Sequence, residues 1–364
     1  MKVPFLDLKA AVADIAPAIE TALLQAARSG QYVMGPELER FETEFAAYCE
    51  AKHCQGVANG LDALRLGLEA MGVGAGDEVI VPANTYIATW LAVSQCGAIP
   101  VPVDPIEATH NIDPDAVAEA ITPKTKVILA VHLYGQPADL DALRVVADQH
   151  GLQILEDAAQ AHGARYKSDR MGARGTATFS FYPSKNLGAL GDGGALVTND
   201  PDIAHQVGLL RNYGSEIKYV HEIKGLNSRL DPLQAAVLSV KLQVLDDWNT
   251  RRRAIAQRYS AAFSKAGLMP PFVPEWAEPV WHLYVLRHDD RDRFQKRLQD
   301  AGIATVIHYP IPPHLQNAYA DLGYEAGRFP LTETLAREVI SLPMCHAQTD
   351  EQTEYVIDRV LKLL

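Results

Sequence analysis

Cysteine is scarce in this sequence, and its spacing carries no recognisable pattern. The 364 residues include only four cysteines, Cys49, Cys54, Cys96 and Cys345. This spacing fits neither a CxxC metal site nor the dense disulfide framework of a small secreted domain. We therefore expect reduced, mostly buried thiols, no metal site and a reducing compartment.

Basic blocks and long apolar runs are missing as well. The formal net charge is −12, and an acidic chain without a long basic block is a poor candidate for binding nucleic acid or a membrane surface. The N-terminus lacks the apolar core of a signal peptide, and no apolar run reaches the roughly 18 residues that a spanning helix needs. We expect a soluble cytoplasmic protein, although an acidic total does not forbid a local pocket for a phosphorylated substrate.

What the sequence does contain is an alternation of helix-like and strand-like segments between residues 37 and 240. Helices are predicted at 37–49, 88–93 and 140–150, and strands at 79–81, 127–131, 153–157, 177–181 and 194–198. Two prolines in 99–104 make that segment an edge strand or no strand. The alternation predicts an α/β domain with a mainly parallel sheet, which binds ligands at the carboxyl ends of its strands.

The last third of the chain has a different pattern. A single long helix is predicted over 232–263, and its cluster Arg251, Arg252 and Arg253 is expected to form a solvated face. A hairpin-like segment at 281–286 and two later helices indicate a smaller α+β unit. We place the boundary so that 1–241 is the large domain and 242–364 the small C-terminal domain.

The segment 179–186, FSFYPSKN, places one lysine, Lys185, among aromatic and hydroxyl side chains, just before the glycine-rich run 188–194. A lysine amine becomes a useful nucleophile when burial or a nearby cation lowers its pKa. A Schiff base with pyridoxal phosphate (PLP) exploits that chemistry. Most lysines are solvated surface charges, so Lys185 needs the rest of a PLP site elsewhere in the chain.

Three upstream segments could supply that site. Asp157 ends a strand-like run, and a carboxylate held against the pyridine nitrogen keeps it protonated; the residue could equally cap a helix over 158–161. The turn at 58–64 could hold a phosphate at a helix N-terminus, or be an ordinary strand-to-helix turn. Tyr86 could stack on the cofactor ring, or pack in the core.

Together, and in this chain order, these motifs resemble the aspartate-aminotransferase superfamily of PLP enzymes (fold type I), and within it the DegT/StrS-type sugar aminotransferases. The resemblance covers almost the whole chain, starting at 5–8 and 35–39 and continuing through 59–64 and 82–86. Its most specific segments are 156–163 and 180–186. The resemblance implies a large mainly parallel-sheet domain with a smaller C-terminal α+β domain.

The resemblance also implies a role for each cofactor residue. Lys185 would form the Schiff base, Asp157 would pair with the pyridine nitrogen, and Gln160 would contact the ring hydroxyl. Tyr86 would stack on the ring, and the phosphate would be held by Gly60, Leu61 and Ser180. His162 would either assist proton transfer or fix its loop. Because the family builds each site from two subunits, Asn227 would reach the phosphate of the partner in a homodimer.

The expected reaction is transamination, because this chain has Lys185 where a dehydratase branch of the family has histidine. Glutamate would give its amino group to the cofactor, and a nucleotide-linked keto sugar would then receive it, with the freed Lys185 moving the proton. Segments 84–89, 212–215 and 308–314 resemble enzymes that aminate C3 of dTDP-linked 3-keto-6-deoxyhexoses. Candidates for contacting the sugar and its diphosphate, or for loop and interface packing, are Tyr182, Tyr219, His308, Tyr309 and His314.

Two alternatives stay open at this point. One is a C4 aminotransferase acting on a UDP- or GDP-linked 4-keto-6-deoxy sugar, which would share every cofactor residue. The other is a PLP-binding regulatory protein without turnover.

Overall fold

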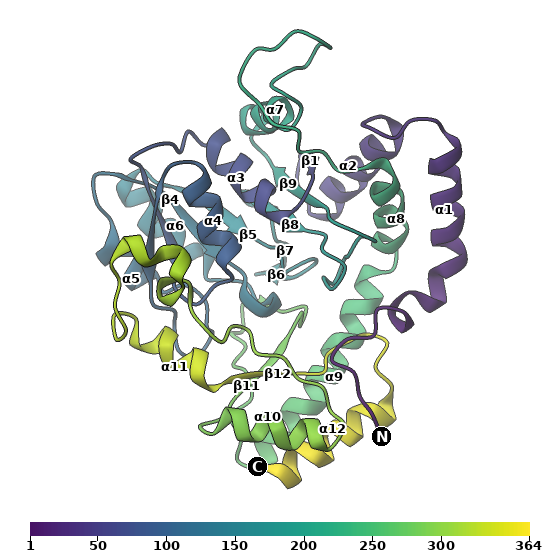
Figure 1. The fold of residues 1–364 in the computed structure, drawn as a ribbon, viewed down its shortest axis with the longest axis vertical. Helices are drawn as coiled ribbons and strands as arrows, with labels where there is room; N and C mark the ends of the chain where they lie inside the picture. The colour runs from purple at the N-terminus through teal and green to yellow at the C-terminus, as the bar shows by residue number, and fades with distance from the viewer.

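A computed structural model describes all residues, 1–364. Its centre is a seven-stranded sheet covered by helices (Figure 1). The strand order is β1 (His53–Val57), β9 (Gly194–Thr198), β8 (Thr176–Ser180), β5 (Gln153–Asp157), β4 (Thr125–Val131), β2 (Glu78–Pro82) and β3 (Ile99–Val103). Only β9 runs antiparallel to its neighbours, and the proline-containing β3 lies at an edge, so both sequence-based predictions are confirmed.

The strands are apolar because both faces of the sheet are buried. On β4, Ile128 and Ala130 belong to one apolar cluster, whereas Val127, Leu129 and Val131 belong to another. Successive strand residues point to opposite faces, so one strand feeds two cores. The helices that supply the other sides of these cores include α2 (Pro36–Tyr48), α3 (Gly60–Ala70), α4 (Ile87–Gln95), α5 (Pro114–Ala120), α6 (Leu140–His150) and α7 (Pro201–Leu210).

The predicted long helix at 232–263 is wrong in one respect, because it is two helices. α8 (Pro232–Leu242) ends before Val244, whose φ of −116° and ψ of 3° leave the helical region, and α9 (Leu245–Lys265) begins there. Asp246 and Asp247 lie in the first turn of α9. Carboxylates favour a helix N-terminus, which explains why a new helix starts at this point.

The C-terminal part has a core of its own. A two-stranded sheet of β11 (Tyr284–Arg287) and β12 (Val339–Leu342) accompanies α10 (Arg291–Asp300), α11 (Pro330–Glu338) and α12 (Asp350–Leu363). Val3 belongs to this C-terminal cluster and bridges to Ile303, so the first residues pack away from the large sheet. We retain the division into 1–241 and 242–364 as a proposal.

Short elements connect the two parts. β10 (Ala277–Glu278) pairs with β6 (Arg165–Tyr166), which pairs with β7 (Asp169–Arg170). The remaining short helices are η2 (Leu133–Gly135), η3 (Pro313–Leu315) and η4 (Asn317–Leu322).

The arginine cluster on α9 is not uniformly solvated, which corrects the sequence-based expectation. Arg251 is exposed, but Arg252 is buried, and its Nη1 donates to the carbonyls of Trp281 and Met344, each at 3.1 Å. A guanidinium can be buried when backbone carbonyls replace its water. This contact needs the folded C-terminal part and leaves no local trace in the sequence.

One segment, Ala10–Arg28, is long and apolar enough to cross a membrane by length and composition alone. It comprises η1 (Ala10–Ile15) and α1 (Ala16–Arg28), whose Ile19 and Ala26 are buried while most of the segment is not. A single such helix near the N-terminus is weak evidence, but the expectation that no segment meets this criterion is not confirmed.

Candidate active site

The turn after β8 presents Lys185 at the carboxyl end of the sheet. Its backbone N–H donates to the Tyr182 carbonyl at 2.9 Å, which closes the turn, and no hydrogen bond or ion pair engages its Nζ. Burial lowers the pKa of the Lys185 amine to about 8, although the nearby Asp157 carboxylate acts in the opposite direction. A substantial fraction of this amine is therefore neutral near pH 7.5, as a nucleophile or base requires.

Asp157 lies at the carboxyl end of β5 and is buried. The alternative that it caps a helix is wrong, because the residues after it form turns. Its Oδ1 accepts from the Ala159 N–H at 3.1 Å and its Oδ2 from the Thr89 hydroxyl at 3.0 Å. Burial raises the pKa of this carboxyl group, and the two hydrogen bonds oppose that rise.

Thr89 is a site residue that the sequence did not reveal. It lies in the first turn of α4, four residues after Thr85, which precedes the helix, and the two hydroxyls are 3.0 Å apart. The sequence pointed to no partner for Thr89 because Asp157 lies 68 residues away.

Gly60 and Ser180 form a narrow cradle where α3 begins. A Cβ placed on Gly60 would lie 2.5 Å from the Ser180 Cβ, so only glycine fits. The Asn59 side chain accepts from the Asp62 N–H at 2.9 Å, which leaves the N–H groups of Gly60 and Leu61 without an intrahelical acceptor. Free N–H groups at a helix N-terminus, beside a hydroxyl, are suited to a phosphate.

Two tyrosines and Gln160 shape the wall next to Asp157. The Gln160 Nε2 donates to the Tyr309 hydroxyl at 3.1 Å, and its Oε1 accepts from the Tyr134 N–H at 2.6 Å. The ring centroids of Tyr86 and Tyr309 are 5.3 Å apart, and Tyr86 is exposed, as a side chain that stacks on a bound aromatic ring must be. Tyr134, which sets the orientation of Gln160, was not found from the sequence.

His162 is completely buried, and neither ring nitrogen has a hydrogen-bond partner. Its ring lies 5.3 Å from Phe179 and 5.9 Å from Phe181. Burial and the Lys185 charge lower the pKa of His162 to about 3, so the imidazole is neutral at any working pH. This setting favours a packing role, and a catalytic role stays a prediction.

The candidate sugar-binding residues have different surroundings. Tyr182 is exposed beside Lys185, and the His308 Nδ1 lies 2.8 Å from the Ser341 hydroxyl. His314 is buried against Phe329, and its Nε2 lies 3.1 Å from Glu333. That placement disfavours contact of His314 with a substrate.

Asn227 and Tyr219 lie on a loop between α7 and α8 that projects from the body of the molecule (Figure 1). Asn227 bridges to Asn212 at the base of this loop and is exposed, and Tyr219 is 83% exposed. The structure therefore does not bring these two residues to the site of their own chain.

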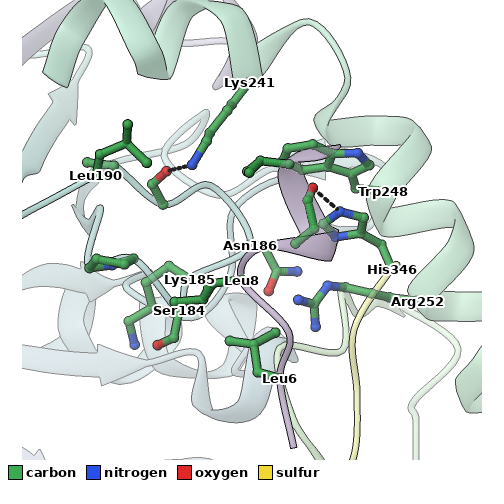
Figure 2. A pocket seen from close by; sticks show the side chains of 15 residues that line it. Leu6, Leu8, Ser184, Lys185, Asn186, Leu190, Lys241, Trp248, Arg252 and His346 are labelled. Carbon is green, nitrogen blue, oxygen red and sulfur yellow. Dashed lines mark hydrogen bonds between the residues drawn. The ribbon is translucent and has the colours of Figure 1, made fainter. Parts of the chain in front are cut away.

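The assembled residues fit PLP. A phosphate cradle that a Cβ would fill, a buried carboxylate, an exposed aromatic face and an unpartnered lysine with a lowered pKa lie at neighbouring strand ends. Behind the lysine, the turn borders a cavity of about 250 Å³ that is lined in part by Lys241, Trp248 and Arg252 (Figure 2).

Comparison with known proteins agrees with this geometry. The chain is 57% identical to the erythromycin biosynthesis sensory transduction protein EryC1 of Saccharopolyspora erythraea, over 98% of each chain. It is 50% identical to the dTDP-3-amino-3,6-dideoxy-alpha-D-galactopyranose transaminase of Aneurinibacillus thermoaerophilus, over 98% of each chain. A crystal structure of S. venezuelae DesV in complex with a ketimine intermediate superimposes with a TM-score of 0.97 at 53% identity, covering 99% of this chain and 98% of that one.

The profile of the DegT/DnrJ/EryC1/StrS aminotransferase family matches residues 13–361. This match covers nearly the whole chain and includes every residue of the cradle, the carboxylate and the lysine turn. The chain belongs to the DegT/DnrJ/EryC1/StrS aminotransferase family.

Proposed function

We propose that this PLP-dependent sugar aminotransferase transfers the amino group of glutamate to C3 of a dTDP-linked 3-keto-6-deoxyhexose. The observation that carries the proposal is the unpaired amine of Lys185, with its lowered pKa, near the buried Asp157 carboxylate. The two residues lie at the ends of β8 and β5. The likeness to a transaminase of a dTDP-linked 3-amino sugar supports the acceptor class and position C3.

Each cofactor residue has a task that its surroundings support. Bound PLP supplies an electron sink for the carbon that loses its proton. Asp157 would stabilise a positive charge on the pyridine nitrogen, and Gln160 would contact the ring hydroxyl. The backbone N–H groups of Gly60 and Leu61, with the Ser180 hydroxyl, would bind the phosphate. Tyr86 would cover one ring face.

Lys185 is the proton carrier in this proposal. Its burial disfavours the charged form, so the neutral amine can accept the proton that the donor loses at Cα and hold it for return. The substrate arrives from the side where Tyr182 is exposed. We assign the sugar and its diphosphate to Tyr182, His308 and Tyr309 of one subunit and to Tyr219 of the partner.

A homodimer is part of the proposal. The loop that carries Asn227 and Tyr219 leaves the body of its own chain, as a segment that completes a neighbouring site must. Leu24, Tyr32 and Val33 are large apolar side chains exposed near α1, which supports a covered surface there. A cytoplasmic location is proposed because all four cysteines are free.

The proposal is tested with purified protein, PLP, glutamate and a panel of sugars. The panel contains dTDP-3-keto-6-deoxyglucose, its galactose isomer, and UDP- and GDP-linked 4-keto-6-deoxy sugars, with mass detection of the amino sugar. We expect turnover of the 3-keto sugars. Turnover of the 4-keto sugars alone would overturn the C3 assignment and favour the C4 alternative.

A regulatory function without turnover is the second candidate, because the relative from S. erythraea has a name that refers to sensory transduction. The intact Lys185 and its lowered pKa favour an enzyme. Adding glutamate to the PLP-loaded protein distinguishes the two. Loss of the visible absorbance band indicates the enzyme, and an unchanged band indicates a binding protein.

A further inference from the structure

The turn that carries Lys185 is held from behind by two buried side chains on α8 and α9. Asn186, the residue after Lys185, donates from Nδ2 to the Asn249 Oδ1 and to the Val280 carbonyl, each at 2.9 Å. Two residues further along the turn, the Gly188 carbonyl accepts from the Lys241 Nζ at 2.5 Å (Figure 2). The turn is thus fastened at two points by groups that do not face the cofactor position.

Asn249 also reaches the segment that carries Asp157 and Gln160. Its Nδ2 donates to the His162 carbonyl at 2.8 Å. One carboxamide therefore joins the lysine turn to the loop of the cofactor carboxylate, and both of its polar atoms are used. Asn249 is buried, as is Asn186, so neither bond competes with bulk water.

The direction of these hydrogen bonds is fixed by their ends. The carbonyls of His162 and Val280 can only accept, so both carboxamides must turn their nitrogen atoms toward them. Asn249 Oδ1 then faces Asn186, and Asn186 Oδ1 faces the His282 Nδ1 at 3.2 Å. This end requires a proton on His282 Nδ1, and burial lowers the pKa of His282 so that the ring is neutral.

The turn has little space to adopt another shape. A Cβ on Gly188 would lie 2.5 Å from the Pro183 carbonyl oxygen, and one on Gly163 would lie 2.8 Å from the Asn249 Nδ2. The Ala189 N–H donates to the Phe181 carbonyl at 2.7 Å. Losing one fastening would therefore leave a buried polar group unpaired rather than allow a simple rearrangement.

Resting on the proposed function, we propose that Asn249 and Lys241 are positioning residues for Lys185. They hold the turn so that the lysine amine stays shielded from water near Asp157. Asn249 also fixes the position of the lysine turn relative to the loop after Asp157. Neither side chain touches the cofactor position. Their effect on the reaction passes through the place and the solvation of the Lys185 amine.

The test measures how fast the cofactor-free protein captures PLP as a function of pH, followed by the visible band of the covalent complex. Capture needs the neutral amine, which adds to the aldehyde with loss of water. For the wild type we expect a midpoint near the Lys185 pKa of about 8. In Asn249→Leu and Lys241→Met the amine is more solvated, so the midpoint shifts upward by about half a unit or more.

Turnover by the loaded enzyme is the second readout. We expect kcat to fall about ten- to hundredfold in either variant with KM for the sugar nearly unchanged, because a small displacement of a reacting group costs rate rather than binding. Lys241→Arg, which retains a donor, restores part of the loss. Asp247→Asn, on the exposed face of the same helix, serves as the matched control.

An unshifted capture midpoint together with a kcat within about twofold of the wild type in both variants would overturn the proposal, even with a lowered melting temperature, since the two residues would then only stabilise the fold. If Asn249→Leu does not fold, Asn249→Ala replaces it, because it removes the same hydrogen bonds to Asn186 and His162 and adds no charge near Lys185. The capture assay needs no sugar or glutamate, so failure of the proposed reaction is distinguished from failure of this inference.

Discussion

Two lysines on either side of one turn, Lys241 buried and Lys185 half-buried, show what separates a reactive amine from a structural one. Burial lowers the pKa of Lys185 and of Lys241 to about 8 in each case. Lys241 uses its Nζ to bind the Gly188 carbonyl, whereas Lys185 has no hydrogen-bond partner and lies within electrostatic reach of Asp157. Figure 2 shows Lys241 reaching the turn while Lys185 points away from it. A lowered pKa alone therefore does not identify the catalytic lysine; the free amine does.

The largest expected effect separates the two lysines directly. Lys185→Ala should reduce kcat at least about 10³-fold, because it removes the covalent attachment point and the positioned base. Lys241→Met should reduce kcat far less. The measurement is amino-sugar formation from glutamate and the 3-keto sugar. A Lys185→Ala protein with normal turnover would refute the central assignment.

Lys185 has a carboxylate, Asp157, within electrostatic reach, and Lys241 has none. Removing the Asp157 charge should have the second-largest effect on kcat. Asp157→Asn keeps the size but removes the charge, so we expect kcat to fall about 10²-fold. The Lys185 pKa should fall as well, because the Asp157 charge raises it. Steady-state kinetics and the pH dependence of PLP capture measure both effects, and an unchanged kcat would contradict the role of Asp157.

The pH dependence of proton transfer sharpens the comparison further. Lys185 works as a base only when neutral, so its lowered pKa predicts a single-turnover rate that rises with pH and levels off above about 8, rather than above the ordinary value of 10.5. His162, with a pKa of about 3, contributes no inflection above pH 5. A profile still rising steeply at pH 10 would show that the amine is solvated.

The smallest expected effect concerns Thr89. Thr89→Val removes the hydroxyl that donates to Asp157, and since that hydrogen bond lowers the pKa of Asp157, the pKa should rise. One hydrogen bond to a charged group is worth about 1.5–3 kcal/mol, so kcat should fall by about tenfold. Thr85→Val, four residues earlier and just before α4, is the matched control and should reduce kcat less, because Thr85 contacts Thr89 and not Asp157.

The sequence predicted those parts of the fold that depend on local patterns. The strands at 153–157 and 194–198 and the helix at 140–150 have the predicted bounds, because apolar runs there end at turn residues. The break at Val244 and the burial of Arg252 were not predicted. The burial of Arg252 depends on packing between α9 and the C-terminal part, which no window of neighbouring residues reports. The break at Val244 has a local signal, Asp246 and Asp247 in the first turn of α9, which the continuous helical pattern obscured.

The candidate site shows the same division. Lys185, Asp157, Gly60, Tyr86 and Gln160 each sit in a short motif, and the structure places them at one end of the sheet. Thr89, Tyr134 and Asn249 were missed because their partners are distant in the chain; Asn249 lies 63 residues from Asn186 and 87 from His162. The residues proposed to bind the cofactor have local signatures, whereas the residues proposed to position them do not.

The projecting loop with Asn227 has a consequence for mixtures of chains. In a homodimer with shared sites, a chain lacking Lys185 can still lend its loop, and a chain lacking Asn227 can still lend its lysine. Two variants, Lys185→Ala and Asn227→Ala, each impaired alone, would form a hybrid with one intact site when they are unfolded together and reassembled. Activity regained in such a mixture would show that each active site is built from two chains.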